Sequence, residues 1–234
     1  MADASKVLII VTAHAELGNT GRATGLWFEE LATPYYAFLD GGARMTIASL
    51  PGGTIPLDPR SLDAGGDNPA SVERFRRDET AMAQMQNSKK LDALSSGDYD
   101  VVFVPGGHGA MWDLGGSTEL GDFLTRSWAG GAVVSSVCHG PAGLVHARET
   151  DGKPLVAGKK VSAFSNSEEN QMQLTEVVPF LLESKLRELG ADYRSGPDFQ
   201  PFAVRDGRLV TGQNPASAEK VARLVLEAAG ENSR

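Results

Sequence analysis

The stretch AVVSSVCHGPAGLVHA, residues 132–147, decides the fold that we expect for this chain. Residues 132–137 are apolar, small and β-branched, which is typical of a strand buried on both faces of a parallel sheet. From Gly140 onward, the apolar spacing and the position of Pro141 predict a helix. Cys138, the only cysteine, lies between the two. A side chain on such a sharp turn projects from the carboxyl edge of the sheet.

This turn is a variant of the nucleophile elbow, with Ser136 in place of the usual first glycine. The amino terminus of the expected helix would favour a thiolate at Cys138. A free cysteine is also a common inert core residue, so that interpretation stays open. His139 and the glycine-rich turn VPGGHG at residues 104–109 favour a reactive thiol.

Other runs along the chain predict an α/β fold with a mostly parallel sheet. Strands are expected at residues 6–12, 43–50, 100–104 and 160–164, and a hairpin at Asp206-Gly207. Helices are expected at 26–39, 75–94, 119–129, 215–229 and 168–189, the last kinked at Pro179, and a long loop at 51–68.

Composition indicates one α/β domain, residues 1–234. The chain carries 22 basic and 30 acidic residues, a formal charge of -8. Without a basic stripe, nucleic acid and anionic membranes are not expected partners. One cysteine excludes an intrachain disulfide and fits a reducing compartment. The polar start and the lack of a long apolar run predict a cytoplasmic protein without a membrane anchor.

Glu30 and the glycine-rich turn at residues 104–109 are further candidates for a catalytic site. Glu30 falls on a largely apolar helix face, which is costly for a carboxylate unless it is paired or protonated, so it is a candidate acid or base. An exposed glutamate is the alternative. Gly107 can direct its amide at a developing oxyanion. His108 is a candidate catalytic residue, but a histidine that caps or packs is the favoured interpretation, and residues 111–114 are expected to wall the pocket.

Two adjacent acids, Glu168 and Glu169, follow the strand expected at residues 160–164. Ser165 and Glu168 match a capping box, so one of the two acids can serve only as a cap. The four histidines show no metal-ligand spacing, and no metal is expected.

Together these motifs resemble the DJ-1/PfpI superfamily, and within it the Hsp31-like group of glutathione-independent glyoxalases (glyoxalase III). The resemblance is carried by VPGGHG with AVVSSVCHGPAGL, by the G-x-x-x-G-x-x-x-x-E-x-x-x-P segment at residues 21–34, and by LVTGQNPAS near the end. It implies a flavodoxin-like three-layer α/β sandwich, a homodimer and no cofactor.

The same resemblance implies roles for site residues. Cys138 would be the nucleophile, His139 its neighbour in a triad, and Glu169 the third member, with Glu168 as the alternative. Glu30 matches the glutamate that contacts the thiol, and Gly107 and His139 match the backbone donors of the oxyanion hole.

The activity implied is conversion of methylglyoxal, a 2-oxoaldehyde, to lactate through a cysteine hemithioacetal. Other members suggest a deglycase, an isonitrile hydratase or a peptide hydrolase that uses the same cysteine. A stress-response chaperone or an oxidation sensor without turnover is a third possibility. Glutamine amidotransferases share the elbow, but their histidine lies far downstream, whereas His139 abuts Cys138.

Overall fold

The computed structural model describes residues 4–62 and 68–232. The strands are β1 (Lys6–Ile10), β2 (Arg44–Ser49), β3 (Lys89–Lys90), β4 (Val101–Val104), β5 (Val133–Val137), β6 (Lys160–Val161), β7 (Asp192–Tyr193), β8 (Ala203–Asp206) and β9 (Leu209–Gly212). The α-helices are α1 (Phe28–Asp40), α2 (Ala70–Arg77), α3 (Glu79–Gln86), α4 (Thr118–Ala129), α5 (Asn166–Gln171), α6 (Leu182–Glu188) and α7 (Ala218–Asn232). Three short 3-10 helices matter for the site: η2 (Pro59–Ser61), η5 (His108–Met111) and η6 (Gly140–Leu144).

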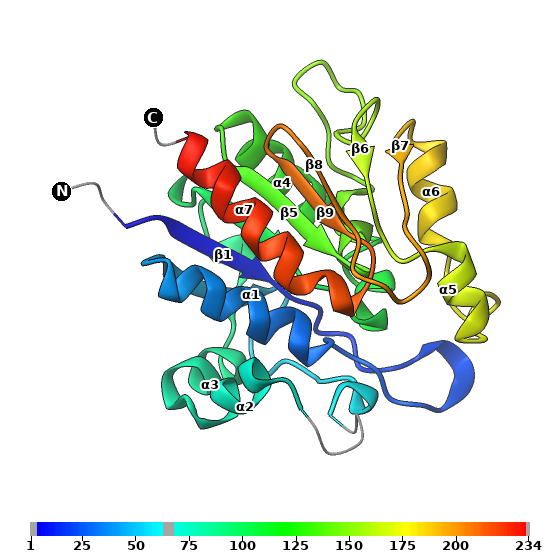
Figure 1. Ribbon diagram of the computed structural model, residues 1–234, viewed down its shortest axis with the longest axis horizontal. Helices are drawn as coiled ribbons and strands as arrows, with labels where there is room; N and C mark the ends of the chain where they lie inside the picture. Colours follow the sequence, from blue (N-terminus) through cyan, green and yellow to red (C-terminus); the bar gives the residue numbers. More distant parts are fainter. Residues whose placement is uncertain (1–3, 63–67, 233–234) are drawn as a thin grey trace.

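Seven of these strands form one sheet in the order β3-β2-β1-β4-β5-β9-β8. Figure 1 shows β5, β9 and β8 side by side in this sheet. All neighbours pair in parallel except β8 and β9, which form an antiparallel hairpin through Asp206 and Gly207, as predicted. The inner order β2-β1-β4-β5-β9 is that of the flavodoxin-like fold. The predicted α/β class with a mostly parallel sheet is therefore confirmed.

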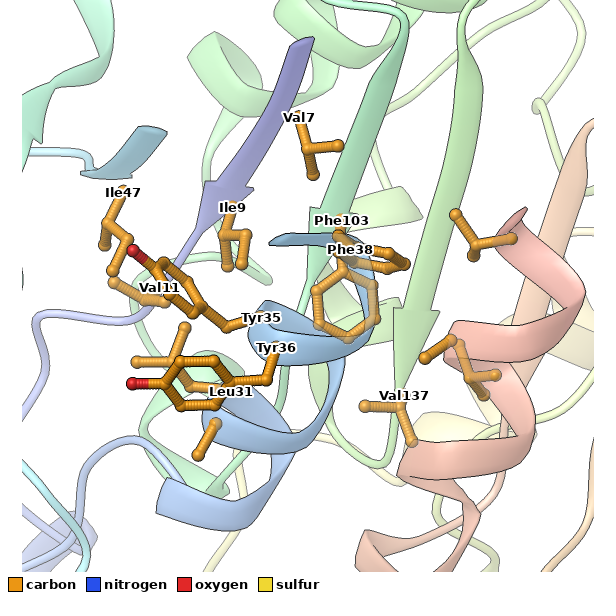
Figure 2. Packing of buried hydrophobic residues seen from close by; sticks show 14 of the residues in the cluster. Val7, Ile9, Val11, Leu31, Tyr35, Tyr36, Phe38, Ile47, Phe103 and Val137 are labelled. Carbon is orange, nitrogen blue, oxygen red and sulfur yellow. The ribbon is translucent and has the colours of Figure 1, made fainter. Parts of the chain in front are cut away.

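Strand residues alternate between two apolar clusters, one on each face of the sheet. Val7 and Ile9 of β1 pack with α1 and α7, whereas Leu8 and Ile10 pack in the cluster that contains α4. Figure 2 shows Val7 and Ile9 on the same face as Leu31 of α1. Burial on both faces explains why these strands are continuous apolar runs. The inward face predicted for the last helix is also buried, at Ala218, Val221, Ala222, Val225 and Ala228.

Several predicted elements are shorter or broken. The segment 75–94 holds the end of α2, then α3, and then β3, because Asp78 ends one helix and caps the next by accepting from the Ala81 amide. The predicted helix 168–189 is two helices, since α5 ends at Gln171 and α6 begins at Leu182. Pro179 therefore lies in a connection and does not kink a helix. The strand expected at 160–164 is only β6, in a separate two-stranded sheet with β7.

Two further boundaries bear on the site. Helix α1 begins at Phe28, two residues after the predicted start, which leaves Trp27 at its N-cap. The predicted loop 51–68 contains η2, and residues 63–67 lie outside the part that the structure describes. The carboxyl ends of the parallel strands β1, β4 and β5 meet at one edge of the sheet, where ligands bind in open α/β folds.

Candidate active site

Cys138 occupies the turn after β5 in a strained backbone conformation. Its φ angle is 60°, in the left-handed region that side chains other than glycine seldom adopt. The Cys138 amide donates to the Gly212 carbonyl at 3.0 Å, and its carbonyl accepts from the Phe164 amide at 2.9 Å. Strain that is held in place this way is common at functional sites and is the geometry of a nucleophile elbow.

The turn leads into η6, a 3-10 helix of five residues, and not into the predicted α-helix. Close packing against β4 accompanies this change: a Cβ on Gly140 would lie 2.0 Å from the Val104 carbonyl oxygen. A macrodipole needs several aligned peptide units, so this short element gives the sulfur little of the stabilisation expected from an α-helix.

The surroundings of Cys138 also oppose the expected thiolate. Burial raises the pKa of the Cys138 thiol well above its ordinary value, and the charge of Glu30 and a hydrogen bond with that residue raise it further. The Gly107 amide lowers the pKa but does not offset these effects. These surroundings favour the thiol over the thiolate, so a reaction at Cys138 needs a group that accepts its proton.

Glu30 is fully buried on α1 beside this thiol. Its Oε2 accepts from the Gly106 amide at 2.7 Å, whereas Oε1 has no well-aligned partner among the described residues. Burial raises the pKa of Glu30 from 4.5 to about 8, although the Gly106 amide and Cys138 oppose the change. Near neutral pH both protonation states are accessible, which suits a group that gives and takes protons.

His139 links the sulfur to Glu169 of α5. Its Nδ1 lies 3.3 Å from Cys138 Sγ, and its Nε2 lies 2.7 Å from Glu169 Oε2. Burial opposes the charge of Glu169, but His139 and His108 together bring the pKa of its carboxyl well below the usual range. An ionised carboxylate only accepts, so the His139 proton is on Nε2. The free lone pair on Nδ1 then faces the thiol.

Glu168 points elsewhere and has a structural environment. Its carboxylate accepts from the Ser165 amide at 2.9 Å, the Phe199 amide at 2.8 Å and Asn214 Nδ2 at 2.8 Å. Ser165 and Glu168 form the predicted capping box of α5. Of the two adjacent acids, it is Glu169 that contacts His139.

Two backbone amides border the sulfur, those of Gly107 and His139. The Gly107 amide hydrogen-bonds to Cys138, and the His139 amide lies against Gly106, where a Cβ would come within 2.5 Å of its nitrogen. Gly107 has φ 99°, and a Cβ there would lie 2.2 Å from the Gly25 carbonyl oxygen. Only glycine fits at this position. The arrangement can receive a negatively charged oxygen formed next to the sulfur.

Gly107→Ala is expected to lower turnover by about 10²- to 10³-fold, because the loop must move and its amide leaves the sulfur. The measurement is kcat on the substrate proposed below, with near-ultraviolet circular dichroism to check the fold. Gly42→Ala is the matched control, since Gly42 has φ 89° but open space around its Cβ position. Equal losses in both variants would assign the effect to backbone strain alone.

Sequence reasoning missed Arg60 and favoured a structural interpretation of His108. His108 on η5 is buried, and its Nε2 lies 2.8 Å from Glu169 Oε1. On the other side of the ring, Arg60 Nη2 lies 3.1 Å from His108 Nδ1. His108 was expected to cap or pack, whereas it bridges Arg60 to Glu169. The only signal for Arg60 was its place in an unusually long loop.

His108, His139 and Glu169 also bring three possible metal ligands within 4.8 Å of one another. Their geometry does not suit a cation. Arg60 donates to His108 Nδ1, so the ring proton is on Nε2, and His139 carries its proton on Nε2 as well. The His108 nitrogen that faces Glu169 therefore lacks a lone pair for a metal while Arg60 occupies Nδ1.

A cavity of about 160 Å³ opens beside Cys138. Its lining is mostly apolar and consists of Trp27, Gly107, His108, Cys138, Phe164, Met172, Phe199 and Pro215. The prediction that residues 111–114 wall the pocket is wrong, because none of them lines this cavity. Trp112 instead stacks on His14, with ring centroids 5.2 Å apart. Such a cavity admits a small organic molecule with little polar surface.

A family model described as "DJ-1/PfpI family" matches residues 23–228. The chain belongs to the DJ-1/PfpI family. No helix in the described part of the chain combines the length and apolar character needed to cross a membrane. Drosophila melanogaster DJ-1beta, with 21% identity and a TM-score of 0.63, shares the fold.

Other family members align over nearly the whole chain. Glyoxalase 3 of Candida albicans is 32% identical, with 95% of this chain and 98% of the relative covered. Glutathione-independent glyoxalase hsp3101 of Schizosaccharomyces pombe is 30% identical, with 97% of each covered. Among solved structures, the Rapid Encystment Protein of Francisella tularensis has a TM-score of 0.91 at 35% identity, with 96% of this chain and 99% of that chain covered.

Proposed function

We propose that this protein is a glutathione-independent glyoxalase that converts methylglyoxal and related 2-oxoaldehydes to 2-hydroxy acids. One observation carries the proposal: the Cys138 thiol lies between two different proton carriers, His139 Nδ1 and Glu30, beside a small cavity. Nucleophilic addition needs the first carrier, and moving hydrogen between two carbons needs the second. The names of the relatives above support the same chemistry.

The reaction begins with addition of sulfur to the aldehyde carbon, C1. His139 Nδ1 takes the thiol proton as the S–C1 bond forms, and Glu169 stabilises the resulting imidazolium. The aldehyde oxygen becomes an alkoxide that accepts from the Gly107 and His139 amides. The product of this step is a hemithioacetal.

Glu30 then moves hydrogen from C1 to C2. Its protonated carboxyl gives a proton to the ketone oxygen, takes the C1 proton and returns it to C2. C1 is thereby oxidised and C2 reduced, so the isomerisation to a thioester needs no external oxidant or reductant. A carboxyl group with a pKa of about 8 suits both directions of transfer.

Hydrolysis of the thioester completes the cycle. Water adds to C1 and gives a proton to Glu30, the C1–S bond breaks, and the departing sulfur recovers its proton from His139. The sum is one methylglyoxal and one water giving one lactic acid, with Cys138, His139 and Glu30 in their starting states.

Incubation of the purified chain with methylglyoxal, without glutathione, tests the proposal. We expect one lactate, of a single chirality, for each methylglyoxal consumed. Amine release from glycated lysine and formamide formation from an isonitrile are measured in parallel, because the same cysteine can serve a deglycase or an isonitrile hydratase. Consumption of methylglyoxal without lactate would refute the proposal.

A further inference from the structure

Arg60 is held in place from both sides. Its Nε lies 2.9 Å from Asp58 Oδ1 and its Nη2 lies 2.6 Å from Asp58 Oδ2, a bidentate pair. The Asp58 side chain is fully buried and also accepts from Thr24 Oγ1 at 2.8 Å. The same Nη2 reaches His108 Nδ1. A buried carboxylate thus fixes where the guanidinium meets the imidazole.

This contact determines the state of His108. Arginine has donors and no acceptor, so Nδ1 must be the accepting nitrogen and the ring proton must be on Nε2. That proton is donated to Glu169 Oε1, while His139 donates to Glu169 Oε2. Protonating His108 on Nδ1 would require Arg60 to move away.

We propose that Arg60 is a positioning residue that acts through His108. It keeps His108 a neutral donor to Glu169, so that the positive charge created during the reaction forms on His139 alone. The kinetic part of this inference rests on the proposed function, whereas the state of His108 can be measured without any substrate.

Neutrality of His108 matters because the His108 and His139 rings lie close together, with centroids 4.0 Å apart and their planes tilted by 40°. An imidazolium at His108 would oppose proton uptake by His139 and weaken it as a base. The charged or titratable groups around His108 are Glu169 from α5, His139 before η6, and Arg60 from η2. Burial, His139 and Arg60 lower the pKa of His108 to about 4, although Glu169 acts in the opposite direction.

The experiment compares pH profiles of kcat/KM for the wild type, Arg60→Met, His108→Gln and the double variant. Arg60→Met frees Nδ1, so its acid limb should move about one pH unit or more toward higher pH. His108→Gln keeps a donor to Glu169 but cannot titrate, so adding Arg60→Met to it should produce no further movement of the acid limb. A movement of the same size in the His108→Gln background would overturn the proposal, because Arg60 would then act by its charge alone.

A second measurement follows the His108 ring by NMR, with its signals identified by their loss in His108→Gln. We expect the His108 pKa to rise in Arg60→Met and to stay low in Arg60→Lys, which retains a donor. Folding of each variant is checked by circular dichroism. If Arg60→Met does not fold, the test rests on the His108 pKa in Arg60→Lys. An unchanged His108 pKa in Arg60→Met, or a raised one in Arg60→Lys, contradicts the proposal. This result stands whether or not methylglyoxal is the substrate.

Discussion

Cys138→Ala is expected to lower lactate formation from methylglyoxal by roughly 10⁴-fold or more, which brings it to the rate in buffer. No other described side chain next to the cavity can form the proposed covalent adduct, and the lining is otherwise apolar apart from His108. The substitution removes one buried sulfur, so the fold should survive. The measurement is the rate of lactate release, together with intact mass after brief exposure to substrate.

Cys138→Ser separates the nucleophile from the space that it fills. Serine retains a hydroxyl at the elbow, but a buried alcohol gives up its proton far less readily than a thiol. We therefore expect an inactive variant with wild-type stability and no mass adduct. If either variant kept more than about one hundredth of the activity, covalent catalysis at Cys138 would be wrong.

The strands and the elbow could be predicted from the sequence because their surroundings demand one kind of residue. Strand β5 is buried on both faces, so every position is small or apolar. The run can therefore be recognised in the sequence without knowing which strands pair with it. The hairpin at Asp206-Gly207 is equally local, since Gly207 adopts φ 59°. Such signals depend only on neighbours in the chain.

Two helix predictions, the one after Cys138 and the one over residues 168–189, were wrong because contacts with distant parts of the chain decide these segments. Gly140 packs on β4, and no local preference reports how close that contact is. Between α5 and α6, Gln173 has φ 58°, which breaks a helix although glutamine has good helix propensity. Packing against distant elements overrides propensity in both places.

Within the site, the distance between two residues along the chain decides whether their contact could be predicted from the sequence. Cys138 and His139 are adjacent, so their pairing could be predicted from the motif. The choice of Glu169 over Glu168 came from a resemblance, since both acids open the same helix. Arg60 and His108 are 48 residues apart, and only the folded chain brings them together.

Glu30→Gln is expected to slow lactate formation by about 10²- to 10⁴-fold while leaving Cys138 able to bind the aldehyde. Glutamine keeps an oxygen for the Gly106 amide but cannot exchange a proton with C1 or C2. Intact mass should therefore show an adduct that persists longer than in the wild type. The matched control is Glu29→Gln, the adjacent acid on α1, which is only partly buried and has no role in the proposed reaction.

The same substitution should raise stability in alkaline solution. The pKa of Glu30 is about 8 in the folded chain, against 4.5 for an ordinary glutamate, so the folded state holds this proton more tightly than the unfolded state does. The contribution of this proton to stability is complete below about pH 4.5 and is lost as pH rises to about 8. A pKa that differs by one between the folded and unfolded chain corresponds to about 1.4 kcal/mol. Glu30→Gln has no such proton to lose, so its advantage over the wild type should grow with pH.

Urea unfolding of the wild type, Glu30→Gln and Glu29→Gln at pH 5 and pH 9 measures this difference. We expect Glu30→Gln to be the more stable chain at pH 9, with a much smaller difference at pH 5, while it remains the slower enzyme at both. A variant that is more stable but less active cannot have lost activity by unfolding. Equal stability of wild type and Glu30→Gln at pH 9 would mean that Glu30 ionises there without cost, and the buried, protonated carboxyl on which the hydrogen transfer depends would not exist.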